Sequence, residues 1–153
     1  MPIPPTPTLP LTTGFHPSIA SLEVQLDGQR YRVKSLEWNH GMDRGVVRSG
    51  VEPDGFTRGE YSVKTFNLEM IELMAATFID ALSARGAYME VSFAVIWTLS
   101  EPAAGYTRKF RAEGCLVKEA GQTINGKEGI MRKIPCDVQR IYEEEKLPFT
   151  PWS

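Results

Sequence analysis

Residues 22–33 read LEVQLDGQRYRV, with apolar and polar side chains alternating on both sides of Asp27-Gly28. An Asp-Gly pair favours the tight two-residue turn of a β-hairpin, because both turn positions need positive φ. The pairs that this turn sets are Leu22–Val33, Glu23–Arg32, Val24–Tyr31 and Gln25–Arg30. One face of the hairpin is then apolar and the other carries opposite charges, as a half-buried antiparallel sheet requires.

Further along the chain, three segments have the patterns of regular elements. The second hairpin strand is expected to continue through Leu36 to Trp38, and residues 60–69 form another strand. A helix is predicted over about 71–85 from apolar residues that recur at intervals of three and four. That stripe consists of Ile71, Met74, Ala75, Phe78, Ile79 and Leu82. Residues 88–99 are apolar on both faces, which predicts a central strand covered on two sides.

Two long strands are predicted over 106–120 and 127–142, with Asn125-Gly126 at the bend. The pairs expected from a tight turn there are Cys115–Cys136, Glu113–Val138 and Phe110–Ile141. Both cysteines are expected to be reduced, buried thiols that pack as small hydrophobic groups. Pro135 lies inside the last strand and cannot donate to a ladder, so that stretch is expected at an edge or a bulge.

The prolines mark the ends of the folded body. The chain has 153 residues and 11 prolines, six of which fall in the first 17 residues. The predicted organisation is a Pro-rich arm over 1–17, one domain over 18–147 and a tail over 148–153. The apolar residues of these ends are Ile3, Leu9, Leu11, Phe15, Phe149 and Trp152. We expect at least one of the two ends to lie along a neighbouring subunit.

Residues 39–59 form a long segment with five glycines between the first hairpin and the next strand. This content predicts a loop rather than a regular element, and loops of this length are usually functional or disordered. Four apolar residues argue against simple disorder, because a solvated linker gains nothing from them. These residues are Val46, Val47, Val51 and Phe56.

Signals of catalysis are weak. Neither His16 nor His40 has a metal ligand at suitable spacing, and the motifs of nucleophilic hydrolases, zinc proteases and phosphate-binding loops are not found. Glu113, Glu119 and Asp137 lie on predicted strands, where a solvated strand face is the simpler interpretation. We therefore predict no enzyme, no cofactor and no metal.

The overall charge and the distribution of apolar residues bear on nucleic-acid and membrane partners. The formal net charge is -2 and the isoelectric point about 5.7, without the basic surplus typical of nucleic-acid-binding domains. No apolar run is long enough for a membrane span, and no secretory signal is recognised, so we expect no membrane partner.

Two stretches resemble bacteriophage tail tube proteins. Residues 36–64, LEWNHGMDRGVVRSGVEPDGFTRGEYSVK, are similar to a strand ending in an aromatic residue, a Gly-rich loop and a G-x-T-R-G step into the next strand. That step consists of Gly55, Thr57, Arg58 and Gly59. The later R-x-x-G-C-x-V stretch over 111–117 looks similar too, and the resemblance covers about residues 20–147.

The resemblance implies a mainly β fold: two packed antiparallel sheets in a barrel-like sandwich, with one flanking helix. It also implies hexameric rings whose strands join into an inner sheet around a lumen, and which stack through the 39–59 loop. The hemolysin-coregulated protein of type VI secretion and the tubes of related contractile injection systems share this plan. Closing strands into a shared sheet would also remove exposed edges.

From the residues and the resemblance together, we predict a self-assembling tail tube subunit of a virion, assembled in the host cytoplasm. Its partners would be itself, tail sheath or baseplate proteins, and viral DNA that passes through the lumen without sequence specificity. The predicted contact residues are Gly41, Val46, Val47, Gly50, Val51, Gly55, Phe56, Arg58, Gly59, Phe149 and Trp152, with Arg58 a candidate for an intersubunit ion pair. The alternatives are a monomeric β-barrel that binds a small ligand under a 39–59 lid, and a tube subunit of a type VI or related injection system.

Overall fold

The computed structural model describes residues 17–124 and 129–150. Their strands are β1 (Ser18–Leu26), β2 (Gln29–Arg32), β3 (Ser35–Asp43), β4 (Val46–Arg48), β5 (Pro53–Phe56), β6 (Glu60–Ile71), β7 (Phe93–Glu101), β8 (Tyr106–Val117), β9 (Gly121–Thr123), β10 (Met131–Asp137) and β11 (Arg140–Glu143). One α-helix, α1 (Glu72–Ser83), and a short 3₁₀ turn, η1 (Pro102–Ala104), complete the described part. The predicted class, mainly β with one flanking helix, is confirmed.

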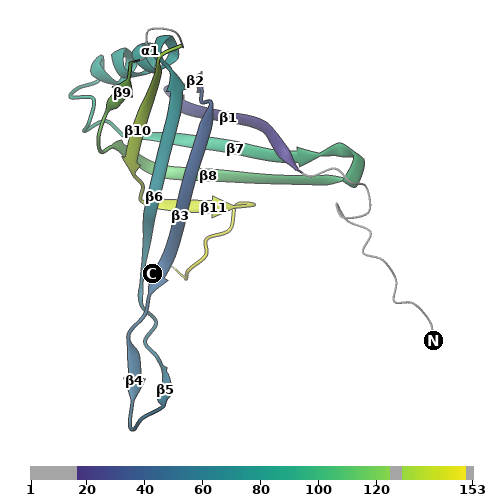
Figure 1. The fold of residues 1–153 in the computed structure, drawn as a ribbon, viewed down its shortest axis with the longest axis vertical. Helices are drawn as coiled ribbons and strands as arrows, with labels where there is room; N and C mark the ends of the chain where they lie inside the picture. Colours follow the sequence, from purple (N-terminus) through teal and green to yellow (C-terminus); the bar gives the residue numbers. More distant parts are fainter. Residues whose placement is uncertain (1–16, 125–128, 151–153) are drawn as a thin grey trace.

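Nine of the strands form one antiparallel sheet that folds over itself into two layers. The order is β2-β1-β7-β8-β10-β6-β3, with β11 on β8 and β9 on β10. Figure 1 shows β1, β7, β8 and β11 running across the long strands β3 and β6, so that the layers cross. β10 joins the layers, because it pairs with β6 along most of its length and with β8 at its end. The result is an open sandwich, with β4 and β5 forming a separate two-stranded sheet.

The first hairpin has the predicted geometry. Asp27 and Gly28 have φ values of 52° and 76°, and Glu23 pairs with Arg32 as expected. The second strand ends earlier than predicted, at Arg32. The backbone N–H of Lys34 then donates to the carbonyl of Glu69 (2.8 Å), which carries the chain into the other layer. β3 is therefore a separate strand that pairs with β6. Its inward side chains enter the core from the layer opposite β1 and β2.

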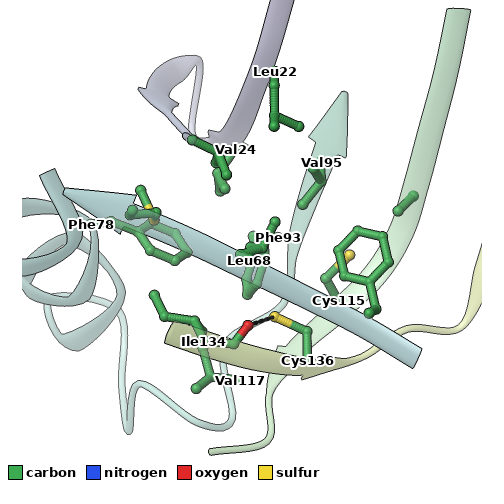
Figure 2. Packing of buried hydrophobic residues seen from close by; sticks show 14 of the residues in the cluster. Leu22, Val24, Leu68, Phe78, Phe93, Val95, Cys115, Val117, Ile134 and Cys136 are labelled. Carbon is green, nitrogen blue, oxygen red and sulfur yellow. Dashed lines mark hydrogen bonds between the residues drawn. The ribbon is translucent and has the colours of Figure 1, made fainter. Parts of the chain in front are cut away.

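Aromatic side chains fill the space between the layers. Trp97 of β7 stacks on Phe110 of β8, with ring centroids 5.3 Å apart and nearly parallel planes. Trp38 and Phe66 of the other layer approach Trp97 at 5.6 and 6.0 Å. Figure 2 shows part of the buried core, in which aliphatic and aromatic side chains from both layers meet. The central position of β7, between β1 and β8, is confirmed, although β7 begins at Phe93 rather than at residue 88.

Helix α1 closes one end of the sandwich. Its buried side chains are Ala75, Phe78 and Leu82, and the Phe78 ring meets Phe93 edge-on at 5.0 Å. An ion pair between Glu72 and Arg132 ties the first turn of the helix to β10. The prediction of Ile71 as part of the buried stripe is wrong, because Ile71 ends β6 and is 56% exposed. The described residues contain no helix with the length and apolar character of a membrane span.

The pairing predicted for the C-terminal half is wrong in register. Cys136 lies opposite Val117 rather than Cys115, Glu113 lies opposite Arg140 rather than Val138, and Phe110 lies opposite Glu143 rather than Ile141. The chain between β8 and β10 is not a simple turn, since β9 intervenes; Asn125 and Gly126 lie outside the described residues. The ladder with β6 ends at Pro135, which agrees with the irregularity expected at a residue without an N–H.

Candidate functional site

The segment predicted as an irregular loop forms a β-hairpin that projects from the body. β3 and β6 pair as far as Asp43 and Glu60, and β4 and β5 continue beyond them (Figure 1). The expectation that residues 39–59 lack regular structure is therefore wrong. The β-branched and aromatic residues there support strands, and Gly45 and Gly59 lie at the joints between β3 and β4 and between β5 and β6. The hairpin points away from the two layers, so the structure gives no support to its role as a lid.

Hydrogen bonds fix the base of this hairpin. The backbone N–H of Thr57 donates to the carbonyl of Gly45 (2.8 Å), and the N–H of Gly45 donates to Thr57 Oγ1 (2.7 Å). Gly59 has φ +84°, and a Cβ there would lie 2.4 Å from the backbone oxygen of Asp43. Glycine is required at this position both by the backbone conformation and by the close approach of β3. The G-x-T-R-G step is thus the joint from which the hairpin extends.

The apolar side chains of the hairpin are exposed to solvent. Val51 at the turn is 94% exposed and Phe56 66%, while Val46 and Val47 are about half exposed. Four such residues on one narrow projection make an apolar surface with no covering group from the described residues. Surfaces of this kind mark protein contacts in soluble proteins. The structure therefore brings together most of the predicted contact residues, whereas Gly41 lies further back, within β3.

The end of the hairpin is also acidic. Glu52 and Asp54 are exposed beside Val51, and residues 49–54, which we call the tip, contain no basic residue. The neighbouring cation Arg48 is held within the hairpin, because its Nη1 donates to the carbonyl of Val51 (2.7 Å). The end of the hairpin thus combines one prominent apolar side chain with two carboxylates and one guanidinium, which give a net charge of -1.

The C-terminal segment packs against the root of the hairpin. The Phe149 ring stacks on Tyr61, with centroids 4.4 Å apart, and Arg58 Nη2 donates to the carbonyl of Thr150 (2.9 Å). Phe149 is therefore placed against its own chain. Trp152 and the arm over 1–16 lie outside the described residues. The docking of either end on a neighbour stays a prediction.

Tyr61 is the centre of a small polar cluster at this root. Its hydroxyl accepts from the backbone N–H of Ile141 (3.0 Å) and lies at hydrogen-bonding distance, 2.8 Å, from His40 Nδ1. Burial lowers the pKa of His40, with an opposing effect from Glu143, and burial raises the pKa of Tyr61. Both groups are thus favoured in their neutral forms, which suits a structural rather than a catalytic hydrogen bond.

The outer face of the β1-β7-β8-β11 layer carries alternating charges. Arg111 lies 3.3 Å from Glu113 and 3.0 Å from Glu145, and its guanidinium stacks over the Tyr142 ring at 4.6 Å. Arg140 lies on the other side of Glu113, at 3.8 Å. These pairs are partly exposed, so each contributes at most about 1 kcal/mol to stability. Their main effect is a polar face on which neither sign of charge dominates.

The candidate acid–base residues do not form a catalytic arrangement. Glu113 is occupied by its arginine partners, and Glu119 and Asp137 are exposed. Within 17–124 and 129–150, His, Cys, Asp and Glu form no group of three that could hold a metal ion. Cys115 and Cys136 are buried free thiols, and burial raises the pKa of Cys136 to about 12. The expectation of reduced, packed cysteines is confirmed.

Sequence reasoning missed a second exposed surface at the other end of the molecule. Ile71 and Leu73 are exposed where β6 meets α1, and Leu73 is 82% exposed. The helical periodicity assigned Ile71 to the core, and Leu73 falls outside the predicted stripe. The extension of β6 to Ile71 and the packing of α1 on the body, which the structure shows, leave these side chains in solvent.

Comparison with protein-family models and with curated proteins finds no match. Solved structures do match. Hcp1 from Flavobacterium johnsoniae has a TM-score of 0.51 and 9% identity, over 85% of this chain and 99% of that chain. The PVC sheath–tube complex of an extracellular contractile injection system contains a chain with a TM-score of 0.59 and 12% identity, over 80% and 87% of the two chains. A chain of the anti-feeding prophage baseplate has a TM-score of 0.58 and 9% identity, over 84% and 96%. The chain therefore shares its fold with these three structures.

Proposed function

We propose that this chain is a structural subunit of a tail-like tube, which self-assembles into hexameric rings that stack around a lumen. The observation that carries the proposal is the projecting β4–β5 hairpin, with four exposed apolar side chains, on a fold shared with tube proteins. A monomer gains nothing from such a projection, whereas a subunit buries it against the next ring. The hairpin is thus the stacking element, and Arg58 and Gly59 belong to the joint that aims it.

Several of the similar structures are assemblies, which supports the choice of partners. Two of them are a sheath–tube complex and a baseplate. We therefore include a sheath or a baseplate protein among the partners of this chain, besides further copies of itself. We propose an architectural role for the chain, in which it catalyses no reaction. Its location would be a tail-like assembly. More specifically, we propose the tail of a virion that assembles in the host cytoplasm.

The finer proposal also assigns viral DNA as the molecule that passes through the lumen. The polar face of the β1-β7-β8-β11 layer is the surface suited to line that lumen, because its other face is the core. On this face Arg111 and Arg140 are offset by Glu113 and Glu145. A strongly basic lining would hold the phosphate backbone, whereas a mixed lining lets it move.

The proposal is tested by assembly of the purified chain, followed by size-exclusion chromatography and electron microscopy. We expect rings and stacked tubes from the unaltered chain. A variant in which Val51 and Phe56 are replaced by serine should give rings that stack poorly, because the apolar contact is lost while the body is untouched. Met89→Ser, which alters an exposed methionine away from the hairpin, is the control and should stack normally. A sharp monomer at high concentration of the unaltered chain would overturn the proposal.

A further inference from the structure

A groove lies beside the exposed residues where β2 approaches the junction of β6 and α1. Its lining residues are Glu23, Arg30, Arg32, Lys34, Ile71 and Met74, and its volume is about 470 Å³. Ile71 and Met74 give it an apolar floor, of which Ile71 is open to solvent. The groove is therefore a place where an apolar side chain of another molecule would be taken out of water.

The rim of the groove is basic. Arg30 is paired with Glu23 at 3.4 Å. Arg32 and Lys34 are exposed and make no ion pair with any residue that the structure describes. Three cations and one anion leave the rim with two unbalanced positive charges. An occupant that combines an apolar side chain with acidic neighbours would match both the floor and the rim.

The hairpin tip has that combination. It presents Val51 beside the carboxylates of Glu52 and Asp54. The guanidinium of Arg48, which donates to the carbonyl of Val51, lies there too, so this end of the hairpin carries a net charge of -1. The tip cannot reach the groove of its own chain. The hairpin leaves the body at the first residue of β6, and Ile71 is the last, so the 12-residue strand separates them by about 35–40 Å. Figure 1 shows the hairpin at one end of the molecule and β2 with α1 at the other.

We propose that this groove receives the hairpin tip of a second copy of the chain. Val51 packs on the floor at Ile71 and Met74, and the tip carboxylates pair with Arg32 and Lys34. This inference rests on the proposed tube function and adds the receiving surface to it. Tip and groove are different surfaces at opposite ends, so the contact is head-to-tail. Such a contact propagates along an open stack instead of closing into a pair.

The test is a charge exchange between the two surfaces. The groove variant carries Arg32→Glu and Lys34→Glu, and the tip variant carries Glu52→Lys and Asp54→Lys. Each variant alone brings like charges together, so we expect the critical concentration for tube formation to rise about tenfold or more. Combining all four substitutions in one chain, or mixing the two variants, restores opposite charges, and tubes should return. Lys118→Glu alters an exposed lysine outside the groove and is the control, expected to assemble as the unaltered chain does.

The outcomes separate this inference from the function on which it rests. If the unaltered chain forms no tubes, the proposed function fails. If tubes form but the tip variant assembles equally well, the groove assignment is wrong while the proposed function stands. The tip side chains are exposed and outside the core, so the result for the tip variant is decisive even if the groove variant unfolds. Failure of both the four-fold variant and the mixture to restore tubes, with each protein folded by circular dichroism, also overturns the pairing.

Discussion

Replacement of Gly59 by alanine should destabilise the protein by about 2–5 kcal/mol. Two costs add in this variant. A non-glycine residue at φ +84° is strained by about 1–2 kcal/mol. The new methyl group would also lie 2.4 Å from the backbone oxygen of Asp43, which cannot move without disturbing the end of the β3–β6 ladder. Relief of such overpacking costs about 1–3 kcal/mol.

The assay is equilibrium unfolding in urea, followed by the fluorescence of the packed Trp38 and Trp97. Gly55→Ala is the matched control, because Gly55 lies in the same hairpin with nothing within 4 Å of a Cβ and without positive φ. Its expected change is between zero and a gain of about 1 kcal/mol. Equal stability of the two variants would refute the close approach of Gly59 to β3. We also expect Gly59→Ala to stack poorly as rings, since the joint that aims the hairpin is altered.

Three further predictions concern the core and its titratable groups. Trp97→Ala should lower the free energy of unfolding by about 3–5 kcal/mol, because it removes the ring that stacks on Phe110, and Trp97→Phe should cost clearly less in the same denaturation assay. The pKa of His40 is lowered in the folded state, so the unfolded chain binds the proton more readily. The free energy of unfolding should therefore fall as the pH drops below about 6.5, and the variant His40→Gln should show a smaller fall when unfolding is measured as a function of pH. Cys115 and Cys136 are buried with raised pKa values, so a thiol reagent should label neither in the folded protein at neutral pH and both in urea; rapid labelling of the folded protein would contradict their burial.

Local signals in the sequence predicted the local structure well. Asp27-Gly28 fixed the first turn and its register, because positive φ at both positions leaves few alternatives. The same kind of reasoning failed for the strands after residue 106. Gly114 has φ +65° and interrupts the regular pleat of β8, while β10 pairs with β6 along most of its length and with β8 only at its last two residues. Alternation along one strand carries no information on which distant strand becomes its partner.

The sequence predicted the hairpin as a candidate contact surface but did not predict the groove. The apolar residues in a Gly-rich segment already marked residues 46–56 as a contact surface, and Val51 and Phe56 are indeed exposed. The groove could not be found in this way. Its lining comes from β1, β2, β6, α1 and the link after β2, which meet only in the folded chain. One of its floor residues, Ile71, fits the helical pattern of a buried residue. A receiving surface of this kind is defined by topology, so only the structure shows it.

The separation of tip and groove has a consequence for the assembly as a whole. A stack joined head-to-tail has two different ends, one with free acidic tips and the other with free basic grooves. A protein that begins the tube and a protein that ends it therefore meet different chemistry. A basic pocket on a partner selects the tip end, and an acidic projection with an apolar residue selects the groove end. Under the proposed contact, the two ends of a stack would therefore differ in charge, with the hairpins exposed at one end and the grooves beside Ile71 at the other.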